Sequence, residues 1–298
     1  MARQTFLLDV PLDLARTIAP HLRGRGDPAM RLAAGHAIRA TRTADGPATF
    51  EIRQFRDRVE VEAWGPGADR ALAAIPAFIG LDDDRTGFAP ANRLLADLDK
   101  RRPGIRIGRS GAVLEALIPA ILEQKVTGGE ARRAYRGIIA RWGEPAPGPF
   151  GLRLLPEPAA LAAIPYHAFH PIGLERRRAD LVRAVAGRAK RFEEVVSMPL
   201  PDAYARLQAL PGIGPWTAAE VALRALGDRD AVSVGDYHLP SLVAYALAGE
   251  RRATDDRMLE LLEPFRGHRA RVIRLLEDGG PRPEARGPRM APRSIAAI

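Results

Sequence analysis

Polar and apolar residues alternate one by one around position 60 of the chain. The stretch RVEVEA at 58–63 has an apolar side chain at every second position, and ATFEIRQ at 48–54 shows a similar alternation. A period of two is typical of a strand with one buried face. The two stretches therefore predict a β-hairpin that turns near Arg56 and Asp57. The next segment, GADRALAAIPAFIG, has helical spacing, and Pro76 should break or kink that helix.

After position 111 the apolar residues recur every three or four positions instead. A stripe of leucine and isoleucine between 114 and 122 predicts a helix, and TGGE at 127–130 is typical of a capping box that starts a second one. Gln124 and Lys125 should therefore lie at a helix–helix turn. No strand signal of comparable strength occurs here. Further helices are predicted at 156–163, 174–189, 202–208, 216–226, 237–247 and 255–277.

Changes in composition divide the chain into three parts. DKRRPGIRIGRSG at 99–111 carries proline, glycine and charge without periodicity, so we expect a domain boundary there. The predicted fold class is α+β, with a small N-terminal antiparallel-sheet domain at 1–105 and a helical domain at 106–278. The remaining segment, 279–298, holds four arginines against one glutamate among prolines and glycines. We expect it to be a basic, disordered tail.

The charge of the chain favours a polyanionic partner. Its 298 residues have a formal net charge of +9, and neutralising phosphates releases counterions and so supplies affinity for nucleic acid. Only three lysines occur. The positive charge is therefore almost all arginine, which can also reflect coding bias. Arg176, Arg177 and Arg178 form a basic run that could contact phosphates, and a solvated helix face is the alternative interpretation.

Several classes of site and location are disfavoured. The chain has no cysteine, which excludes disulfides, thiolate zinc sites and cysteine-held iron–sulfur clusters. His167 and His170 have no third ligand in a recognisable pattern, so we expect no metal site. No apolar run approaches the length of a membrane span, and no charged leader precedes a long apolar core. We therefore expect a cytoplasmic protein without a membrane partner.

The stretch LPGIGPWTAAEVALRALGDRDAVSVGDY at 210–237 is the most specific feature of the sequence. Gly212, Ile213 and Gly214 predict a tight turn between helices, because glycine accepts positive φ and has no Cβ to block a ligand. Backbone amides at such a turn can bind a phosphate. For the Gly-x-Gly pattern alone, an ordinary helical hairpin with glycines for geometry is the favoured interpretation.

LPGIGPWTA followed by ALGDRDAVSVGDY resembles the signature of the helix-hairpin-helix (HhH-GPD) DNA glycosylase superfamily, in particular its 3-methyladenine DNA glycosylase II (AlkA-like) branch. LEALIPAILEQKVTGGEA, HPIGLERRRADLV and EPFRGHRARVIRLL are similar to further helices of this branch. The resemblance covers roughly 1–277 and is strongest from 114 to 240. It implies a small N-terminal antiparallel domain followed by an all-helical HhH-GPD glycosylase domain.

The resemblance places Asp236 at the family's catalytic position. Cleaving an N-glycosidic bond builds positive charge on the deoxyribose, and a fixed carboxylate can stabilise that charge or orient the attacking water. An aspartate after glycine is also a common N-cap of a helix, and the two roles can coexist. Trp216 and Tyr237 match positions of the family's aromatic base pocket, where a cationic base is attracted after it is flipped. Core packing is the alternative for both.

The resemblance also assigns residues to the DNA-binding surface. It places Gly212, Ile213, Gly214 and Thr217 in the hairpin that meets DNA. Gln124 and Lys125 match the loop that fills the gap left by the flipped base, although Lys125 replaces an apolar wedge. For Gln124, ordinary helix capping remains open.

The chain also departs from the patterns of its suspected relatives. Glu220 and Arg274 stand where the best-known relatives have aromatic residues, which puts the substrate range in question. Relatives that nick the strand have a lysine where this chain has Trp216, so we expect a monofunctional enzyme.

These observations predict a monofunctional glycosylase of base excision repair. Its substrate would be alkylated purines, such as 3-methyladenine, in damaged double-stranded DNA, and its product an abasic site. We expect a monomer of the nucleoid-associated cytoplasm that uses no cofactor, with a structural monovalent cation possible at the hairpin. Two alternatives stay open: a glycosylase for another damaged base, such as a deaminated purine, and a non-catalytic DNA-binding protein.

Overall fold

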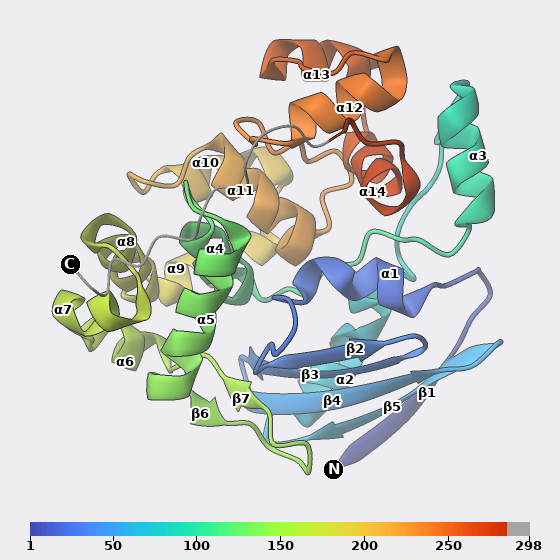
Figure 1. The fold of residues 1–298 in the computed structure, drawn as a ribbon. Coiled ribbons are helices and arrows are strands. Elements are labelled where there is room, and N and C mark those ends of the chain that lie inside the picture. The colour runs from blue at the N-terminus through green and yellow to red at the C-terminus, as the bar shows by residue number, and fades with distance from the viewer. Residues whose placement is uncertain (285–298) are drawn as a thin grey trace.

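A five-stranded antiparallel sheet forms the N-terminal part of the structure, a computed structural model that describes residues 1–284 (Figure 1). The strand order is β1-β5-β4-β3-β2. The predicted hairpin at Arg56 and Asp57 is confirmed, because β4 and β5 pair on either side of it. The strands are β1 (Ala2–Leu7), β2 (Met30–Ala33), β3 (His36–Thr43), β4 (Gly46–Gln54) and β5 (Arg58–Trp64).

Both faces of this sheet contact other elements. Ile52, Val59 and Val61 lie in a core shared with the helices α1 (Leu14–Ile18) and α2 (Ala68–Phe78). Successive residues of a strand point to opposite faces, and accordingly Ile38 of β3 packs on the other side, against Leu152 and Leu154. The sheet is therefore fixed to the helical part of the chain through β3.

Two local expectations need correction. The helix α2 continues through Pro76 and ends at Phe78, so the proline lies in its last turn and does not break it. The proline leaves the carbonyl of Leu72 without its helical donor, and the helix ends two residues later. The region after residue 111 is also not wholly helical, because β6 (Glu144–Pro145) and β7 (Arg153–Leu154) form a two-residue antiparallel ladder.

The helical part of the chain is arranged around α4 (Val113–Leu122). Nine of its ten residues are buried, as expected of a helix that is apolar all round. Glu193 caps the N-terminus of α4, because its carboxylate accepts hydrogen bonds from the amides of Val113 and Leu114. Burial raises the pKa of this carboxyl. The predicted capping box is confirmed at Thr127 and Glu130, at the start of α5.

The α-helices after the sheet agree with most of the predicted segments. The helix predicted at 216–226 is α11 followed by a π-helical turn over Ala222–Leu226. The α-helices are α3 (Arg93–Arg101), α4, α5 (Gly128–Trp142), α6 (Pro158–Ala163), α7 (Tyr166–Phe169), α8 (Arg176–Ala186), α9 (Ala189–Glu193), α10 (Leu200–Gln208), α11 (Pro215–Val221), α12 (Leu239–Ala248), α13 (Asp255–Leu262) and α14 (Arg269–Gly279). Short 3₁₀ turns lie at Ala19–His21, His170–Ile172, Glu194–Ser197 and Glu263–Phe265.

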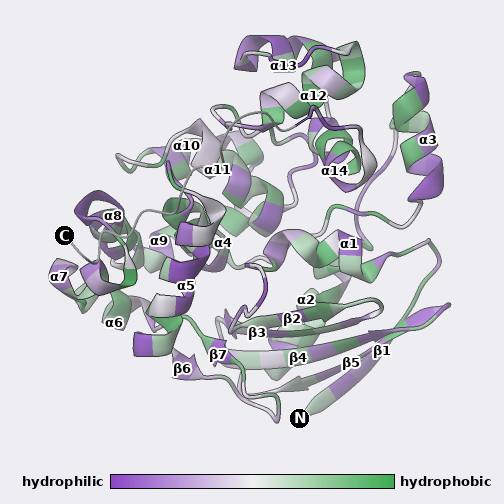
Figure 2. Ribbon diagram, in the orientation of Figure 1, coloured by the Kyte–Doolittle hydropathy of each residue, from purple (hydrophilic) through white to green (hydrophobic). Residues whose placement is uncertain are grey.

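The single helix predicted at 255–277 is wrong. The chain forms α13 and α14 there, separated by a turn that contains Pro264 and Gly267, because proline cannot continue the hydrogen-bond ladder and Gly267 has a φ of +89°. Both helices contribute to a second core together with α12 and α3, through residues such as Leu98, Met258 and Leu276. Figure 2 shows the mixture of apolar and polar residues along α3 that this one-sided packing requires.

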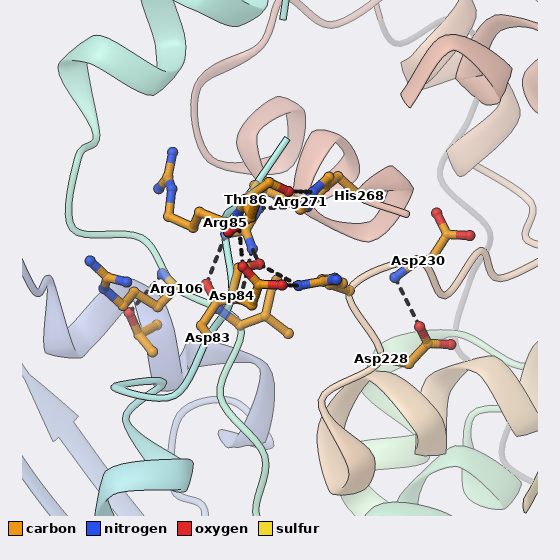
Figure 3. A network of polar contacts seen from close by, with 12 residues as sticks. Asp83, Asp84, Arg85, Thr86, Arg106, Asp228, Asp230, His268 and Arg271 are labelled. Carbon is orange, nitrogen blue, oxygen red and sulfur yellow. Dashed lines mark hydrogen bonds and ion pairs between the residues drawn. The ribbon is translucent and has the colours of Figure 1, made fainter. Parts of the chain in front are cut away.

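A network of polar contacts joins the segment after α2 to α14 (Figure 3). Asp83 forms a bidentate ion pair with Arg271, and both side chains are only 2% exposed. Asp83 also accepts a hydrogen bond from the amide of Ile107. His268 contacts the carbonyl oxygen of Thr86 at 2.9 Å. The two parts of the chain are thus locked together by buried charge as well as by apolar contacts.

Most of the predicted tail at 279–298 lies outside the described residues. Within residues 1–284, no helix is both long and apolar enough to cross a membrane. The domain boundary placed at residue 105 stays a prediction.

Candidate active site

The Gly-Ile-Gly turn joins α10 to α11. Gly212 has a φ of +101°, and a Cβ there would lie 3.0 Å from a methyl carbon of Leu181, so both backbone conformation and space favour glycine. Ile213 is buried, and its amide donates to the carbonyl of Leu210. The turn is therefore anchored from inside by apolar contacts.

The outer side of this turn offers backbone donors. The amides of Gly212 and Gly214 have no hydrogen-bond partner among residues 1–284. Gly212 is exposed and Gly214 is partly exposed. Unpaired amides at a positive-φ turn before a helix are suited to an anion, so the geometry agrees with the phosphate contact expected for this turn.

Asp236 lies in the loop between the π-helical turn and α12. Its Oδ1 accepts hydrogen bonds from the amides of His238 (2.8 Å) and Leu239 (2.9 Å). Its Oδ2 accepts one from the indole Nε1 of Trp216, at 3.1 Å. Asp236 thus accepts from the amides at the start of α12 with one oxygen and faces α11 with the other. The N-cap residue of α12 is His238, so Asp236 lies two residues before the cap and is not the N-cap itself. These bonds leave the carboxylate partly exposed and fixed in direction.

The two aromatic candidates have different surroundings. Trp216 is partly buried, and it belongs to none of the hydrophobic clusters of the described residues. Its clearest contact is the hydrogen bond to Asp236. Tyr237 is 89% exposed, and its ring stacks edge-on against that of His238, with the centroids 4.8 Å apart. The structure therefore brings Trp216 and Asp236 together and leaves Tyr237 on the surface beside them.

The turn between α4 and α5 meets the hairpin directly. Gln124 donates its amide to the carbonyl of Gly212 at 3.0 Å and to Oγ1 of Thr217 at 2.9 Å. Lys125 is exposed and has a φ of +55°, the only positive φ of a non-glycine residue within residues 1–284. That conformation is unfavourable for a residue with a Cβ. In this state Gln124 braces the hairpin, and the strained Lys125 forms the tip of the loop.

Of the two charged residues at the expected aromatic positions, Glu220 forms a cluster with Ser233 and Arg224, and Arg274 has separate partners. Glu220 lies one helical turn after Trp216 and accepts hydrogen bonds from Ser233 and Arg224. Arg274 of α14 donates to the carbonyl of Arg16 and pairs with Glu277. Sequence reasoning missed Ser233 and Arg224. The spacing of Glu220 and Arg224, four residues apart, was the available signal for the pair.

More arginines approach this cluster from the N-terminal part of the chain. Arg23 is buried and pairs with Glu123 at 3.6 Å, just before Gln124. Burial lowers the pKa of Arg23, and the charge of Arg224 lowers it further. Burial and the surrounding arginines also lower the pKa of His21 well below its ordinary value. A cavity of about 10 Å³ lies between His21, Arg224 and Arg274, too small for more than a single water.

Two further sequence signals lie outside this region: the arginine run at 176–178 and the histidines His167 and His170. Of the arginines at 176–178, Arg178 is buried and donates to Glu175 and to the carbonyl of Leu122. It therefore belongs to the fold rather than to a solvated face. No group of three or more histidine, aspartate or glutamate residues within residues 1–284 is arranged to hold a metal ion.

The fold is that of the helix-hairpin-helix DNA glycosylases. A 3-methyladenine DNA glycosylase from Archaeoglobus fulgidus superposes with a TM-score of 0.76 at 20% identity, over 93% of this chain and 98% of the other. An 8-oxoguanine glycosylase/lyase from Clostridium acetobutylicum, in complex with double-stranded DNA, superposes with a TM-score of 0.69 at 14% identity, over 92% and 96% of the two chains. At these identities the likeness concerns the fold alone.

Two relatives found by sequence share more identical residues with this chain than these two structures do. The chain is 32% identical over 192 residues to a probable bifunctional transcriptional activator/DNA repair enzyme AlkA of Mycobacterium tuberculosis, covering 61% of this chain and 38% of that protein. It is 29% identical over 181 residues to DNA-3-methyladenine glycosylase 2 of Escherichia coli, covering 59% and 62%. The chain thus spans less than two thirds of either relative. No protein-family model matches it. The resemblance to the AlkA-like branch is confirmed.

Proposed function

We propose that the chain is a monofunctional DNA N-glycosylase of base excision repair, with alkylated purines such as 3-methyladenine as substrates. The observation that carries this proposal is the carboxylate of Asp236, held by the Trp216 indole and by two backbone amides. Trp216 follows the Gly-Ile-Gly hairpin by two residues. A fixed, partly exposed carboxylate beside an anion-binding turn is the arrangement that hydrolysis at a phosphate-linked sugar needs.

The steps of the reaction follow from these residues. The amides of Gly212 and Gly214 would hold a backbone phosphate of damaged double-stranded DNA, and the target nucleotide would be flipped out of the duplex. The positive charge that builds on the deoxyribose as the bond to the base breaks would be stabilised by Asp236. Water would then complete the hydrolysis and leave an abasic site. With Trp216 in place of an amine nucleophile, no Schiff base forms at this position.

The remaining roles are part of the same proposal. The loop of Gln124 and Lys125 would enter the gap in the duplex, with Gln124 leaving its bonds to the hairpin. The exposed side chain of Tyr237 would take up a fixed position when DNA binds. The protein would act as a monomer in the cytoplasm, associated with the nucleoid.

No cofactor is consumed in this scheme. A structural monovalent cation would be held by hairpin carbonyls such as those of Leu210 and Gly212. Each of these oxygens accepts one hydrogen bond, from the amide of Ile213 and the side chain of Gln124 respectively. Since a carbonyl oxygen has two lone pairs, a cation fits there and would add positive charge beside the phosphate.

The test is release of free 3-methyladenine from methylated duplex DNA, comparing the wild type with Asp236→Asn. Asparagine keeps the acceptor for the amides of His238 and Leu239 and removes the charge, and its NH2 group replaces the oxygen that accepts from the Trp216 indole. We expect the single-turnover rate to fall at least about 100-fold, the range for losing a group that stabilises transition-state charge, with DNA affinity kept. Asp256→Asn is the matched control, because Asp256 is exposed in the first turn of α13.

The outcomes separate the alternatives. Release by the wild type and by Asp256→Asn, but not by Asp236→Asn, would support both the reaction and the role of the carboxylate. If the wild type binds DNA but releases no alkylated purine, the same assay with a deaminated purine distinguishes another specificity from a non-catalytic binder.

A further inference from the structure

The charged side chain nearest to Trp216 along α11 is Glu220. The two residues are four apart and so lie on the same face of the helix. Each contacts the loop that carries Asp236: Trp216 donates to Asp236 itself, and Glu220 accepts a hydrogen bond of 2.5 Å from Ser233. The loop of Asp236 is therefore bound by two residues of one face of α11.

Glu220 is held in place without losing all of its acceptor capacity. Its Oε2 is bound by Arg224, whose guanidinium is itself anchored on the carbonyl oxygens of Pro20 and Glu220. Its Oε1 accepts from the neutral hydroxyl of Ser233. A carboxylate has about four acceptor positions, and the Glu220 side chain remains 13% exposed. One oxygen with a neutral partner is thus left for a further donor or a positive charge.

The backbone directly after Glu220 departs from a regular α-helix. The helix changes to a π-helical turn at Ala222–Leu226, directly after Glu220. Such turns occur in proteins mostly at functional sites. The turn carries Arg224, and its carbonyls at Arg224 and Ala225 accept from the amides of Ser110 and Gly111. The widened turn therefore positions both the carboxylate and its anchor.

We propose that Glu220 selects positively charged, N-alkylated bases over neutral ones, with its carboxylate facing the base that Trp216 contacts. This rests on the proposed glycosylase function. A purine alkylated on a ring nitrogen carries a positive charge in DNA, whereas a deaminated or undamaged purine is neutral. The ion pair with Arg224 offsets part of the negative charge of Glu220, and the charge that remains at Oε1, whose partner is neutral, attracts a cation. The charge of Glu220 thus replaces the aromatic side chain expected at this position.

The test compares five proteins on three substrates. The proteins are the wild type, Glu220→Gln, Glu220→Asp, Ser233→Ala and the control Glu277→Gln. The substrates are duplexes with one 7-methylguanine, which is cationic, one hypoxanthine, which is neutral, or one tetrahydrofuran abasic site, which has no base. Single-turnover release is measured on the first two and binding affinity on the third, after circular dichroism and thermal unfolding have shown that each variant folds.

We expect Glu220→Gln to lower 7-methylguanine release at least tenfold. Hypoxanthine release should be unchanged or faster, and affinity for the abasic duplex should change less than twofold. Glu220→Asp keeps the charge and should retain the preference for the cationic base, and Ser233→Ala should retain it as well. Glu277→Gln, which removes a negative charge at the exposed partner of Arg274, is the matched control and should behave as the wild type.

Three results would overturn the inference. An active wild type with an unaffected Glu220→Gln variant refutes it while leaving the proposed function intact. Equal losses on the cationic and the neutral base, or a loss in Ser233→Ala as large as that in Glu220→Gln, would show that Glu220 only positions the loop of Asp236. If the wild type releases no alkylated base, the proposed function fails first and this inference with it.

Discussion

The buried ion pair between Asp83 and Arg271 makes the most quantitative prediction about this fold. Asp83 to Ala removes a carboxylate whose oxygens lie 2.8 and 2.6 Å from the guanidinium. Arg271 would then stay 98% buried with only weaker neutral partners, such as the carbonyl of Asp84 at 3.3 Å. Breaking a buried pair by removing one partner costs about 3–5 kcal/mol of the free energy of unfolding. The amide of Ile107 also loses its acceptor, which adds about 1 kcal/mol or more.

The assay is urea unfolding followed by tryptophan fluorescence at constant pH. We expect Asp83→Ala to lower the free energy of unfolding by at least about 3 kcal/mol. Asp45→Ala is the matched control. It breaks an Arg70–Asp45 pair whose side chains are 55% and 51% exposed, so its effect on the free energy of unfolding should be much smaller. The double variant Asp83→Leu with Arg271→Met removes both charges and should be more stable than Asp83→Ala.

The reasoning is refuted if Asp83→Ala lowers the free energy of unfolding by no more than Asp45→Ala does. It also fails if the double variant is less stable than Asp83→Ala, because the penalty then would not come from an unpaired buried charge. A large effect also has a functional consequence. Arg271 belongs to α14, whose Arg269 is held by Asp230 in the loop that leads to Asp236. Loosening α14 should therefore slow base release as well as lower stability.

Two further predictions concern the site and the pH dependence of stability. Trp216→Phe keeps an aromatic ring but removes the indole donor to Asp236, so single-turnover base release should fall about tenfold while DNA affinity stays the same; an unchanged rate would contradict a positioning role. Hydrogen bonding by Arg229 holds the pKa of Asp84 well below its ordinary value of 3.8, so this carboxylate stabilises the fold above that pH and loses the contribution as the pH falls below it. The stability difference between the wild type and Asp84→Asn should accordingly shrink on acidification below pH 3.8 in urea titrations, and a difference that grows instead would contradict the sign.

Features that depend on neighbouring residues were predictable from the sequence. The β4–β5 hairpin followed from strict alternation, and the capping box of Thr127 and Glu130 from residues three apart. The Gly-Ile-Gly turn was predictable from its glycines, although only Gly212 has a positive φ and a close neighbour, and Gly214 has a φ of −92° with open space around it. The helix predicted at 255–277 failed because the apolar period continued across Pro264 and Gly267, where the backbone could not.

The relation of each candidate residue to its partner was decided by the tertiary structure. Gln124 and Gly212 are 88 positions apart and meet through a side chain and a carbonyl oxygen, a contact that no local pattern encodes. Arg178 looked like part of a basic surface, yet packing against the end of α4 buries it.

The sequence by itself therefore determined the types and approximate limits of most elements, the turn that offers free amides, and the identity of the carboxylate at 236. The elements and the turn follow from periodicity, capping and glycine geometry, which act over a few residues, whereas Asp236 was chosen from the resemblance to the glycosylase superfamily. Only the folded chain decided that Asp236 faces Trp216, that Glu220 contacts Ser233 of the same loop, and that Tyr237 lies on the surface. The physical reason is that these contacts depend on how separate helices and loops pack, and packing is set by the sum of long-range contacts across the chain.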